Sequence, residues 1–426
     1  RSSSVTSALK KGFAGVFKMN SLIRMNAIVP CLRRVANRRG VTCHNDALDL
    51  THCSTMNFID LKAQYALIKD AVNDRMQAVL NHGAYIMGPE VLEAEKQLAA
   101  FGQVKHCLSC ANGTDALILA LMAKGIGPGD AVFVPSFTFV ASGESVVLVG
   151  ATPVFIDVTP DTYNMDPASL EAAIEMVRQE GKLRLGCVMP VDLFGQPADY
   201  DVINAVAKKH GMFVLGDAAQ SYGATYKGRP VGGLADITAT SFFPAKPLGC
   251  YGDGGAVFTN DDALLDVLKS IRVHGQGSDK YDNVRIGING RMDTLQAAVL
   301  LEKLVIFPQE IKARQEVARR YNEALADVAV VPVVGKDATS VWAQYTLQVE
   351  QREEVLKRLA ADKIPTAIYY PKPTHTQPPY LKYPVTPGGL PVSEHLAKRV
   401  FSLPMHPYLD QATQDQIISA VRKALA

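Results

Sequence analysis

The sequence predicts an α/β fold built on a mostly parallel sheet with helices on both faces, followed by a smaller α/β lobe. Between residue 106 and residue 217, short runs rich in β-branched residues alternate with helical segments, a pattern typical of parallel strands joined by crossover helices. The chain has 426 residues, of which 48% are apolar. A chain of this length and composition buries a large core and has room for a second lobe.

The elements are expected in a definite order. Apolar residues at helical spacing predict two helices, at residues 65–82 and 89–102, separated by a Gly-Pro turn. The alternating part then has strands in "HCLSC", "AVFVPSF", "PVFIDV", "GCVMPVDLF" and "MFVLGD", and helices that begin near Thr114, Ala141, Pro167 and Tyr200. Two further strands, "ITATSFF" and "GAVFTN", precede a long helix from about residue 293 to residue 324. Mixed strands, helices and a Pro-rich loop make up the rest.

Three parts of the chain are distinguished on this basis: an extension over residues 1–55, a large domain over 56–310 and a small domain over 311–426. The extension contains no acidic residue before Asp46 and is rich in Ser, Arg and Lys, which resembles an organellar transit peptide. The motif "MNFIDLKAQY" from Met56 also looks like a natural start. Residues 1–55 are therefore either a targeting segment or a translated or disordered appendage.

Charge and cysteine content exclude several classes of protein. The extension holds nine Lys or Arg against two Asp, so residues 56–426 carry 35 basic and 40 acidic residues and no basic face for nucleic acid is expected. No apolar run is long enough to cross a bilayer. Seven cysteines, an odd number, favour a reducing compartment such as the cytoplasm. Cys107 and Cys110 form a CxxC without a second pair, so no metal site is expected.

The first motif with a possible chemical role is "SCANGTDAL", where a strand ends and a helix begins near Gly113 and Thr114. Glycine lets the backbone approach a ligand closely, and the free N–H groups of a first helical turn favour a phosphate. An ordinary helix cap by Thr114 or Asp115 explains the same residues. The motif alone leaves both interpretations open.

The second motif is "MFVLGDAAQSYGA", in which an apolar strand ends at Asp217. Open α/β sheets bind ligands at the carboxyl ends of their strands. A buried carboxylate needs a partner, and a protonated pyridine nitrogen would serve. A cap of the following turn is the alternative role for Asp217.

The third motif, "SFFPAKPLGCYGDGGAVFT", places Ser241 and Lys246 on a Gly-rich loop. Apolar neighbours would lower the pKa of Lys246 by desolvation, as an amine nucleophile requires. Most lysines are solvated surface charges, and this motif alone does not exclude that role here.

Taken together, "NGTDAL", "PSFTFVAS", "GDAAQSYGA", "SFFPAKPLGCYGDGGA" and "GINGRMDTLQAAVL" resemble the sugar aminotransferases of the DegT/DnrJ/EryC1/StrS family. The resemblance runs from about Met56 to the C-terminus. It implies the pyridoxal-phosphate-dependent transferase fold of type I, with a seven-stranded type of sheet and a smaller C-terminal domain. It also implies a homodimer with shared active sites.

The resemblance further implies roles for individual residues. Lys246 would carry pyridoxal 5'-phosphate as a Schiff base and then move a proton, and Asp217 would keep the pyridine nitrogen protonated. The other cofactor contacts implied are Gln220 near the ring hydroxyl, Phe139 (or Phe137) stacked on the ring, and Gly113, Thr114, Ser241 and the partner subunit's Asn289 at the phosphate. Three residues are candidates for contact with the sugar, namely His274, Arg291 and His375, although each also has an ordinary structural explanation.

The resemblance implies a transaminase that moves the amino group of L-glutamate to a keto group of a nucleotide-linked sugar. The segment from "RVHGQG" to "LLEKL" looks most like enzymes that aminate UDP-linked 3-keto-N-acetylglucuronic acid for surface polysaccharide. Three other functions are compatible with a chain of this type: a dehydratase-like relative, a regulatory protein of the same fold and a generic amino-acid aminotransferase. Dehydratase-like relatives carry His in place of the lysine, so Lys246 argues against the first. The complete set of Lys246, Asp217, Gln220 and Ser241 argues against the second.

Overall fold

The computed structural model describes residues 56–426, so the predictions made for residues 1–55 lie outside the described residues. A seven-stranded sheet forms the centre, with the strand order β1-β9-β8-β5-β4-β2-β3. Every pair from β8 to β3 is parallel, whereas β9 is antiparallel to both β8 and β1. The predicted mostly parallel sheet is confirmed. The strand bounds are β1 (His106–Cys110), β2 (Asp130–Pro135), β3 (Thr152–Ile156), β4 (Arg184–Val188), β5 (Phe213–Asp217), β8 (Ile237–Ser241) and β9 (Gly255–Thr259).

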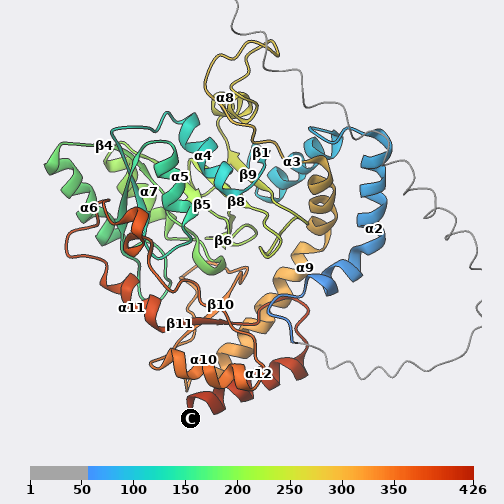
Figure 1. The fold of residues 1–426 in the computed structure, drawn as a ribbon, viewed down its shortest axis with the longest axis vertical. Coiled ribbons are helices and arrows are strands. Elements are labelled where there is room, and N and C mark those ends of the chain that lie inside the picture. The colour runs from blue at the N-terminus through green and yellow to red at the C-terminus, as the bar shows by residue number, and fades with distance from the viewer. Residues whose placement is uncertain (1–55) are drawn as a thin grey trace, which may run out of the picture. The chain divides into compact units, whose positions relative to one another are not determined.

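Helices cover both faces of this sheet (Figure 1). On β2, Phe133 belongs to one apolar cluster and its neighbours Val132 and Val134 to another, because successive side chains of a strand point to opposite faces. The first cluster includes side chains of α6 (Pro167–Glu180) and α7 (Tyr200–Lys209), and the second those of α4 (Gly113–Ala123), α5 (Ala141–Leu148) and α8 (Asp262–Arg272). A sheet buried on both faces is what the near-continuous apolar strands require.

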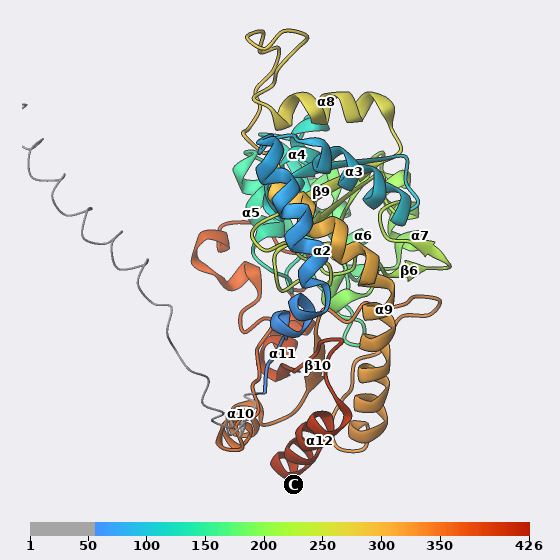
Figure 2. The ribbon, with the colours of Figure 1, turned by 90° about the vertical axis from the view of Figure 1, so that its right-hand side faces the viewer.

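The long helix α9 (Thr294–Leu325) connects the sheet to the C-terminal part of the chain. Its first half packs through Ala297, Leu300 and Phe307 into the cluster that contains the β9 side chain Phe258. Its second half packs through residues such as Tyr321 into a separate cluster of C-terminal residues. The helices α2 (Leu61–His82) and α3 (Pro89–Phe101) lie against α9 (Figure 2).

The C-terminal lobe pairs β10 (Tyr345–Gln348) with β11 (Val400–Leu403) in antiparallel orientation. Its helices are α10 (Arg352–Ala361), α11 (Pro391–Arg399) and α12 (Gln411–Leu425). The Pro-rich loop between α10 and α11 contains two short 3-10 helices, Thr374–Thr376 and Pro378–Tyr380. In the described part of the chain, no helix is long and apolar enough to span a membrane.

A few elements differ from the sequence-based expectation. The first helix begins at Leu61 rather than at residue 65, because the Asp60 side chain accepts a hydrogen bond from Ala63 N at 2.9 Å and caps it. The helix α8 was not predicted, nor was the small hairpin of β6 (Thr225–Tyr226) and β7 (Arg229–Pro230). Neither lies at the carboxyl ends of the parallel strands, where open α/β sheets bind ligands.

Candidate active site

A cavity of about 600 Å³ lies where β5, the start of α4 and the loop after β8 meet. Seven of the predicted site residues line it: Gly113, Thr114, Phe139, Asp217, Gln220, Ser241 and Lys246. These residues lie up to 133 positions apart in the sequence and come together because parallel strands end at one edge of the sheet.

The start of α4 presents unused hydrogen-bond donors to this cavity. Asn112 caps the helix by accepting a hydrogen bond from Asp115 N at 2.8 Å. No acceptor for the backbone N–H groups of Gly113 and Thr114 is found among residues 56–426. A side chain could not replace Gly113, because its Cβ would lie 2.6 Å from Ser241 Cβ. The result is a tight turn with two free N–H groups and a hydroxyl residue beside them, as an anion site requires.

Asp217 ends β5 and is only 5% exposed. Its carboxylate accepts hydrogen bonds from Ser142 Oγ at 2.8 Å and from Ala219 N at 3.2 Å. Burial raises the pKa of Asp217, while these two donors and the charge of Lys246 act in the opposite direction. A buried carboxylate whose pKa is still raised is a suitable partner for a cationic group of a ligand in the cavity.

We expect Ser142→Ala to lower kcat by roughly 10-fold, because Asp217 loses a hydrogen bond worth about 1.5 kcal/mol to its charged form. Steady-state kinetics and the absorbance of the bound cofactor measure this effect. Ser145→Ala is the matched control, since Ser145 lies on the same helix but donates to the Ser142 carbonyl at 3.1 Å. Equal kcat values for the two variants would contradict the assigned role of Ser142.

Lys246 lies on the loop between β8 and β9 and is partly buried. Within the described residues, its ammonium has no hydrogen-bond or salt-bridge partner. Desolvation lowers the pKa of Lys246, against the opposing effect of the Asp217 charge. The loop is held close to the start of α4, where a Cβ on Gly255 would lie 2.4 Å from the Asn112 carbonyl oxygen. The amine therefore faces the cavity instead of bulk water.

Two aromatic residues and Gln220 form another part of the wall. Gln220 Oε1 accepts a hydrogen bond from Phe194 N at 2.7 Å, and its Nε2 donates to the Tyr370 hydroxyl at 3.1 Å, which fixes the amide orientation. The rings of Phe139 and Tyr370 lie 6.1 Å apart. Phe139 is 54% exposed and lines the cavity, whereas Phe137 is 1% exposed and packs in a separate cluster. Of these two phenylalanines, only Phe139 is free to stack on a ring.

The sequence reasoning missed some lining residues, notably Ser142, Tyr369 and Tyr370. Ser142 follows the predicted aromatic by three positions in "FTFVAS" and lies in the first turn of α5. The two tyrosines come directly before the Pro-rich loop. Two adjacent aromatic residues were the only feature of the sequence that could have suggested a role in the site.

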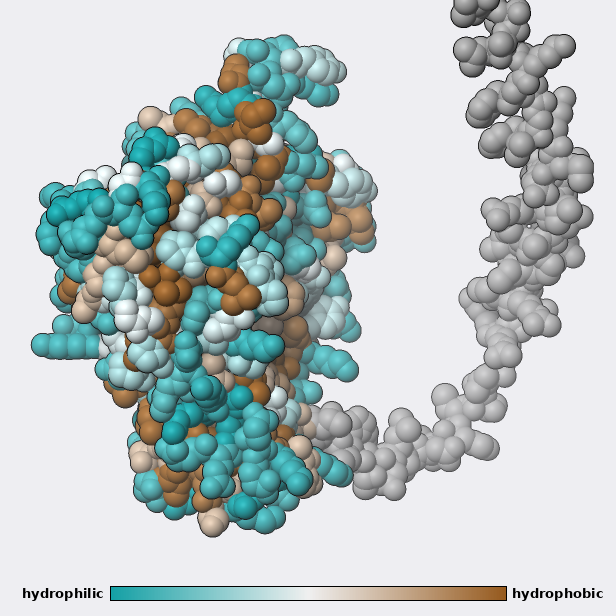
Figure 3. All heavy atoms as spheres, turned by 60° about the vertical axis from the view of Figure 1, so that its left-hand side comes forward, coloured by the Kyte–Doolittle hydropathy of each residue, from teal (hydrophilic) through white to brown (hydrophobic). Residues whose placement is uncertain are grey.

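Three predicted residues lie outside this cavity on the segment that follows α8: His274, Asn289 and Arg291. Asn289 Oδ1 accepts a hydrogen bond from Arg291 at 2.6 Å, and both are at the surface. The segment between them and His274 extends from the body as a loop beyond α8 (Figure 2). It carries Tyr281 and Ile286 at 84% and 83% exposure. Apolar residues also lie near the base of the projecting loop in Figure 3.

His375 lies outside the cavity as well. Its Nδ1 is 2.7 Å from Ser136 Oγ, and its Nε2 is 3.3 Å from Glu394. These contacts fasten the Pro-rich loop to the end of β2, the ordinary structural role that the sequence left open.

The described residues contain no cluster of three or more metal-ligating side chains. Cys107 and Cys110 are buried, free thiols, and burial raises the pKa of both.

The unpaired groups around the cavity fit one cofactor. Free N–H groups at the start of α4 suit a phosphate, Asp217 suits a protonated ring nitrogen, and the unpaired Lys246 amine suits a covalent link to an aldehyde. Phe139 offers a face to an aromatic ring. With the mostly parallel sheet, these features define a fold-type I enzyme that depends on pyridoxal 5'-phosphate.

Comparisons with known proteins identify the family. The DegT/DnrJ/EryC1/StrS aminotransferase family model matches residues 66–422, and the chain belongs to this family. It is 50% identical over 367 residues to the UDP-2-acetamido-2-deoxy-3-oxo-D-glucuronate aminotransferase of Pseudomonas aeruginosa, covering 86% of this chain and 99% of the relative.

Solved structures agree with this assignment. A DegT DnrJ EryC1 StrS aminotransferase from Brucella abortus matches with a TM-score of 0.86 and 55% identity over 87% of this chain and 100% of that one. The ntda structure from Bacillus subtilis, with bound cofactor PMP, matches with a TM-score of 0.78 and 28% identity over 86% and 83% of the two chains. The predicted fold class, enzyme class and cofactor are confirmed.

Proposed function

We propose that this enzyme transfers the amino group of L-glutamate to the 3-keto group of a UDP-linked N-acetylglucuronic-acid-type sugar, for surface polysaccharide biosynthesis. The observation that carries the proposal is the unpaired Lys246 amine, which shares a cavity with the buried Asp217 and the free N–H groups that begin α4. The uronate assignment is supported by the relative that is 50% identical and named for that substrate.

When bound, pyridoxal phosphate supplies a conjugated ring that accepts the electron pair left when the substrate carbon loses its proton. Lys246 would hold the cofactor covalently through Nζ. When not so engaged, Nζ would take the proton from the substrate carbon and carry it. Its lowered pKa keeps a larger fraction of the amine unprotonated for this work.

The other lining residues hold the cofactor and keep the cavity polar where charge develops. Asp217 keeps the ring nitrogen protonated, and Ser142 orients its carboxylate. Gly113, Thr114 and Ser241 bind the phosphate at the start of α4. Gln220 meets the ring hydroxyl with its oriented amide, and Phe139 covers one face of the ring.

We further propose that two copies of the chain form a homodimer with shared active sites. Among the described residues that line the cavity, Lys246 is the only cationic side chain, yet the substrate brings two phosphates and a carboxylate. The projecting loop and its flanks supply His274, Asn289 and Arg291 at the surface. In the proposed dimer, Asn289 reaches the phosphate of the partner's site and Arg291 the uronate carboxylate.

Mixing two inactive variants tests the shared site. Lys246→Ala and Asn289→Ala homodimers are each expected to be impaired, the first completely. Co-expressed, they form hybrid dimers in which one of the two sites keeps both residues, so the activity of the hybrid dimer returns to roughly half of the wild-type value. Activity of purified hybrid dimers is the measurement, with Lys246→Ala mixed with Lys227→Ala, an exposed residue away from the cavity, as the positive control. Failure of the first mixture to recover, with recovery in the control, would exclude a site completed by Asn289.

We place the domain boundary near residue 310, within α9, because the two halves of that helix pack into different clusters.

The four described cysteines are free and buried. Free thiols support a reducing compartment, such as the cytoplasm, as the place where the enzyme acts.

The two half-reactions test the function separately. L-glutamate added to the cofactor-loaded enzyme is expected to change the absorbance of the bound cofactor and to release one equivalent of 2-oxoglutarate per site. The aminated enzyme is then expected to react with UDP-3-keto-N-acetylglucuronic acid and not with a 2-keto acid such as pyruvate. Turnover between amino and keto acids without a nucleotide sugar would show a generic amino-acid aminotransferase, and a protein that binds no cofactor would show a regulatory member of the fold.

A further inference from the structure

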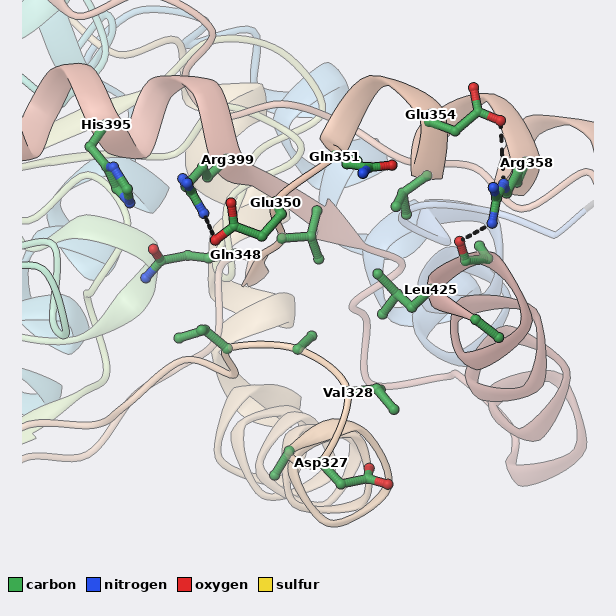
Figure 4. Close-up of a pocket in the computed structure, with 17 residues that line it drawn as sticks. Asp327, Val328, Gln348, Glu350, Gln351, Glu354, Arg358, His395, Arg399 and Leu425 are labelled. Carbon is green, nitrogen blue, oxygen red and sulfur yellow. Dashed lines mark hydrogen bonds and ion pairs between the residues drawn. The ribbon is translucent and has the colours of Figure 1, made fainter.

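The C-terminal lobe contains a second large cavity, of about 820 Å³, between α10, α11 and the end of α12 (Figure 4). Its charges neutralise one another, since Arg399 pairs with Glu350 and Arg358 with Glu354. No buried polar side chain that lacks a partner, among residues 56–426, lines this cavity. This cavity therefore gives no indication of a particular ligand. A buried carboxylate outside the wall of the active-site cavity, Asp192, carries a clearer inference.

Asp192 follows β4 at the same edge of the sheet as Asp217. The backbones of the two segments are joined there: Asp217 N donates to Pro190 O at 2.9 Å, and Asp192 N donates to Asp217 O at 3.0 Å. The side chain of Asp192 is 0% exposed. Its Oδ1 accepts a hydrogen bond from Ala198 N at 3.0 Å, and its Oδ2 accepts one from Ser221 Oγ at 2.7 Å.

One of these hydrogen bonds closes the turn after β4, and the other joins that turn to the segment after β5. The bond to Ala198 closes the tight turn over residues 192–198, in which Phe194 has a φ of 59° and Gly195 a φ of 107°. In this turn the Phe194 N–H donates a hydrogen bond to Gln220 Oε1 at 2.7 Å. The bond to Ser221 holds the residue directly after Gln220. Asp192 thus acts on Gln220 in two ways without lining the cavity: through the turn that carries Phe194 N to the amide oxygen, and through Ser221, the next residue along the backbone.

Burying a carboxylate costs free energy, because its charged form loses contact with water. Burial raises the pKa of Asp192 to about 7, with Asp217 adding to the rise and with the donors Ser221, Ala198 and Tyr200 opposing it. Near neutral pH an amide side chain is therefore a close substitute. Asparagine can accept from Ala198 N and donate to Ser221 Oγ with the same shape.

We propose that Asp192 is a positioning residue that sets the orientation of Gln220 toward the cofactor through Ser221 and the 192–198 turn. The proposal rests on the proposed function only in that the cavity binds pyridoxal phosphate. Asp192 is fully buried and does not line the cavity, so its role would be indirect, through Gln220.

The test is the dissociation constant of pyridoxal phosphate, titrated into cofactor-free protein, for a set of variants. Asp192→Ala is expected to weaken binding roughly 5-fold or more and to shift the absorbance of the bound cofactor, because loss of a buried hydrogen-bond partner misplaces Gln220. Ser221→Ala removes the hydroxyl that donates to Asp192 and is the milder change. It is also expected to weaken cofactor binding. Asp192→Asn is expected to stay within 2-fold of the wild type.

The matched control is Asp157→Asn. Asp157 is a buried carboxylate that follows β3 and accepts hydrogen bonds from Ser393 N, Ser393 Oγ and Val392 N, away from the cofactor cavity. It is expected to lower the Tm of the cofactor-free protein without changing cofactor affinity. A merely structural role for Asp192 would give the same pattern as this control.

Three outcomes would overturn the proposal: unchanged cofactor affinity in Asp192→Ala, unchanged affinity in Ser221→Ala when Asp192→Ala does not fold, or equal losses in Asp192→Asn and Asp192→Ala. The last would mean that the charge of Asp192, and not its hydrogen bonds, is what matters. These titrations need no sugar substrate, so they stand apart from the transamination assays. A wild-type protein that binds the cofactor but does not turn over would contradict the proposed function alone.

Discussion

Lys246→Ala is expected to lower transamination on the order of 10³-fold or more, because the variant loses both the covalent attachment point and the group that moves the proton. The Lys246 amine lies unpaired in the cavity with a lowered pKa, and no other lysine among residues 56–426 lines that cavity. Borohydride treatment of the wild type should fix the cofactor irreversibly to Lys246, located by peptide mass. The variant should still bind the cofactor, though reversibly.

Lys227→Ala is the control for this experiment, since Lys227 is an exposed lysine paired with Asp201 far from the cofactor chemistry. It should keep wild-type activity and the same labelled peptide. Label on a different lysine, or substantial turnover by Lys246→Ala, would contradict the assigned role.

Asp217→Asn is expected to lower kcat by roughly 10²-fold to 10³-fold. Asparagine keeps the shape, can accept from Ala219 N with its one oxygen and can donate to Ser142 Oγ with its nitrogen, but it has no charge to keep the ring nitrogen protonated. The ring then accepts the electron pair poorly, so the effect should fall on kcat much more than on cofactor affinity. Single-turnover kinetics of the glutamate half-reaction measure the chemical step directly.

Asp157→Asn is also the matched control here, because it removes a buried strand-end carboxylate that contacts α11 and not the cavity. Its kcat should remain near that of the wild type. If Asp217→Asn lost cofactor affinity while keeping kcat, Asp217 would be a structural residue of the pocket and not the partner of the ring nitrogen.

The sheet could be predicted from sequence because its strands are short apolar runs between helices with clear boundaries. The carboxyl end of β5 at Asp217 was predicted to the residue. The helix α8 was missed, although its apolar residues also recur at helical spacing around Leu264, Leu268 and Ile271. It follows β9, beyond the regular alternation on which the prediction relied.

The lining of the cavity was predictable where a residue's own motif suggests its chemistry, as with Lys246 and the turn at Gly113. Ser142 and Asp192 could not be predicted in the same way. Each acts through a hydrogen bond to another segment, 75 positions away for Ser142 and 29 for Asp192, and a single sequence does not reveal such pairs. His375 differs from these: it was predicted as a sugar contact, and in the structure its ring contacts Ser136 and Glu394 outside the cavity.

The most direct test of the account follows the amino group itself. The purified enzyme is incubated with ¹⁵N-labelled L-glutamate and UDP-3-keto-N-acetylglucuronic acid, and the nucleotide-sugar product is analysed by mass spectrometry and NMR. The proposed function predicts one ¹⁵N atom bonded to C3 of the sugar for each 2-oxoglutarate released, and no transfer with Lys246→Ala. Unlabelled sugar, or label found only in amino acids, would contradict it.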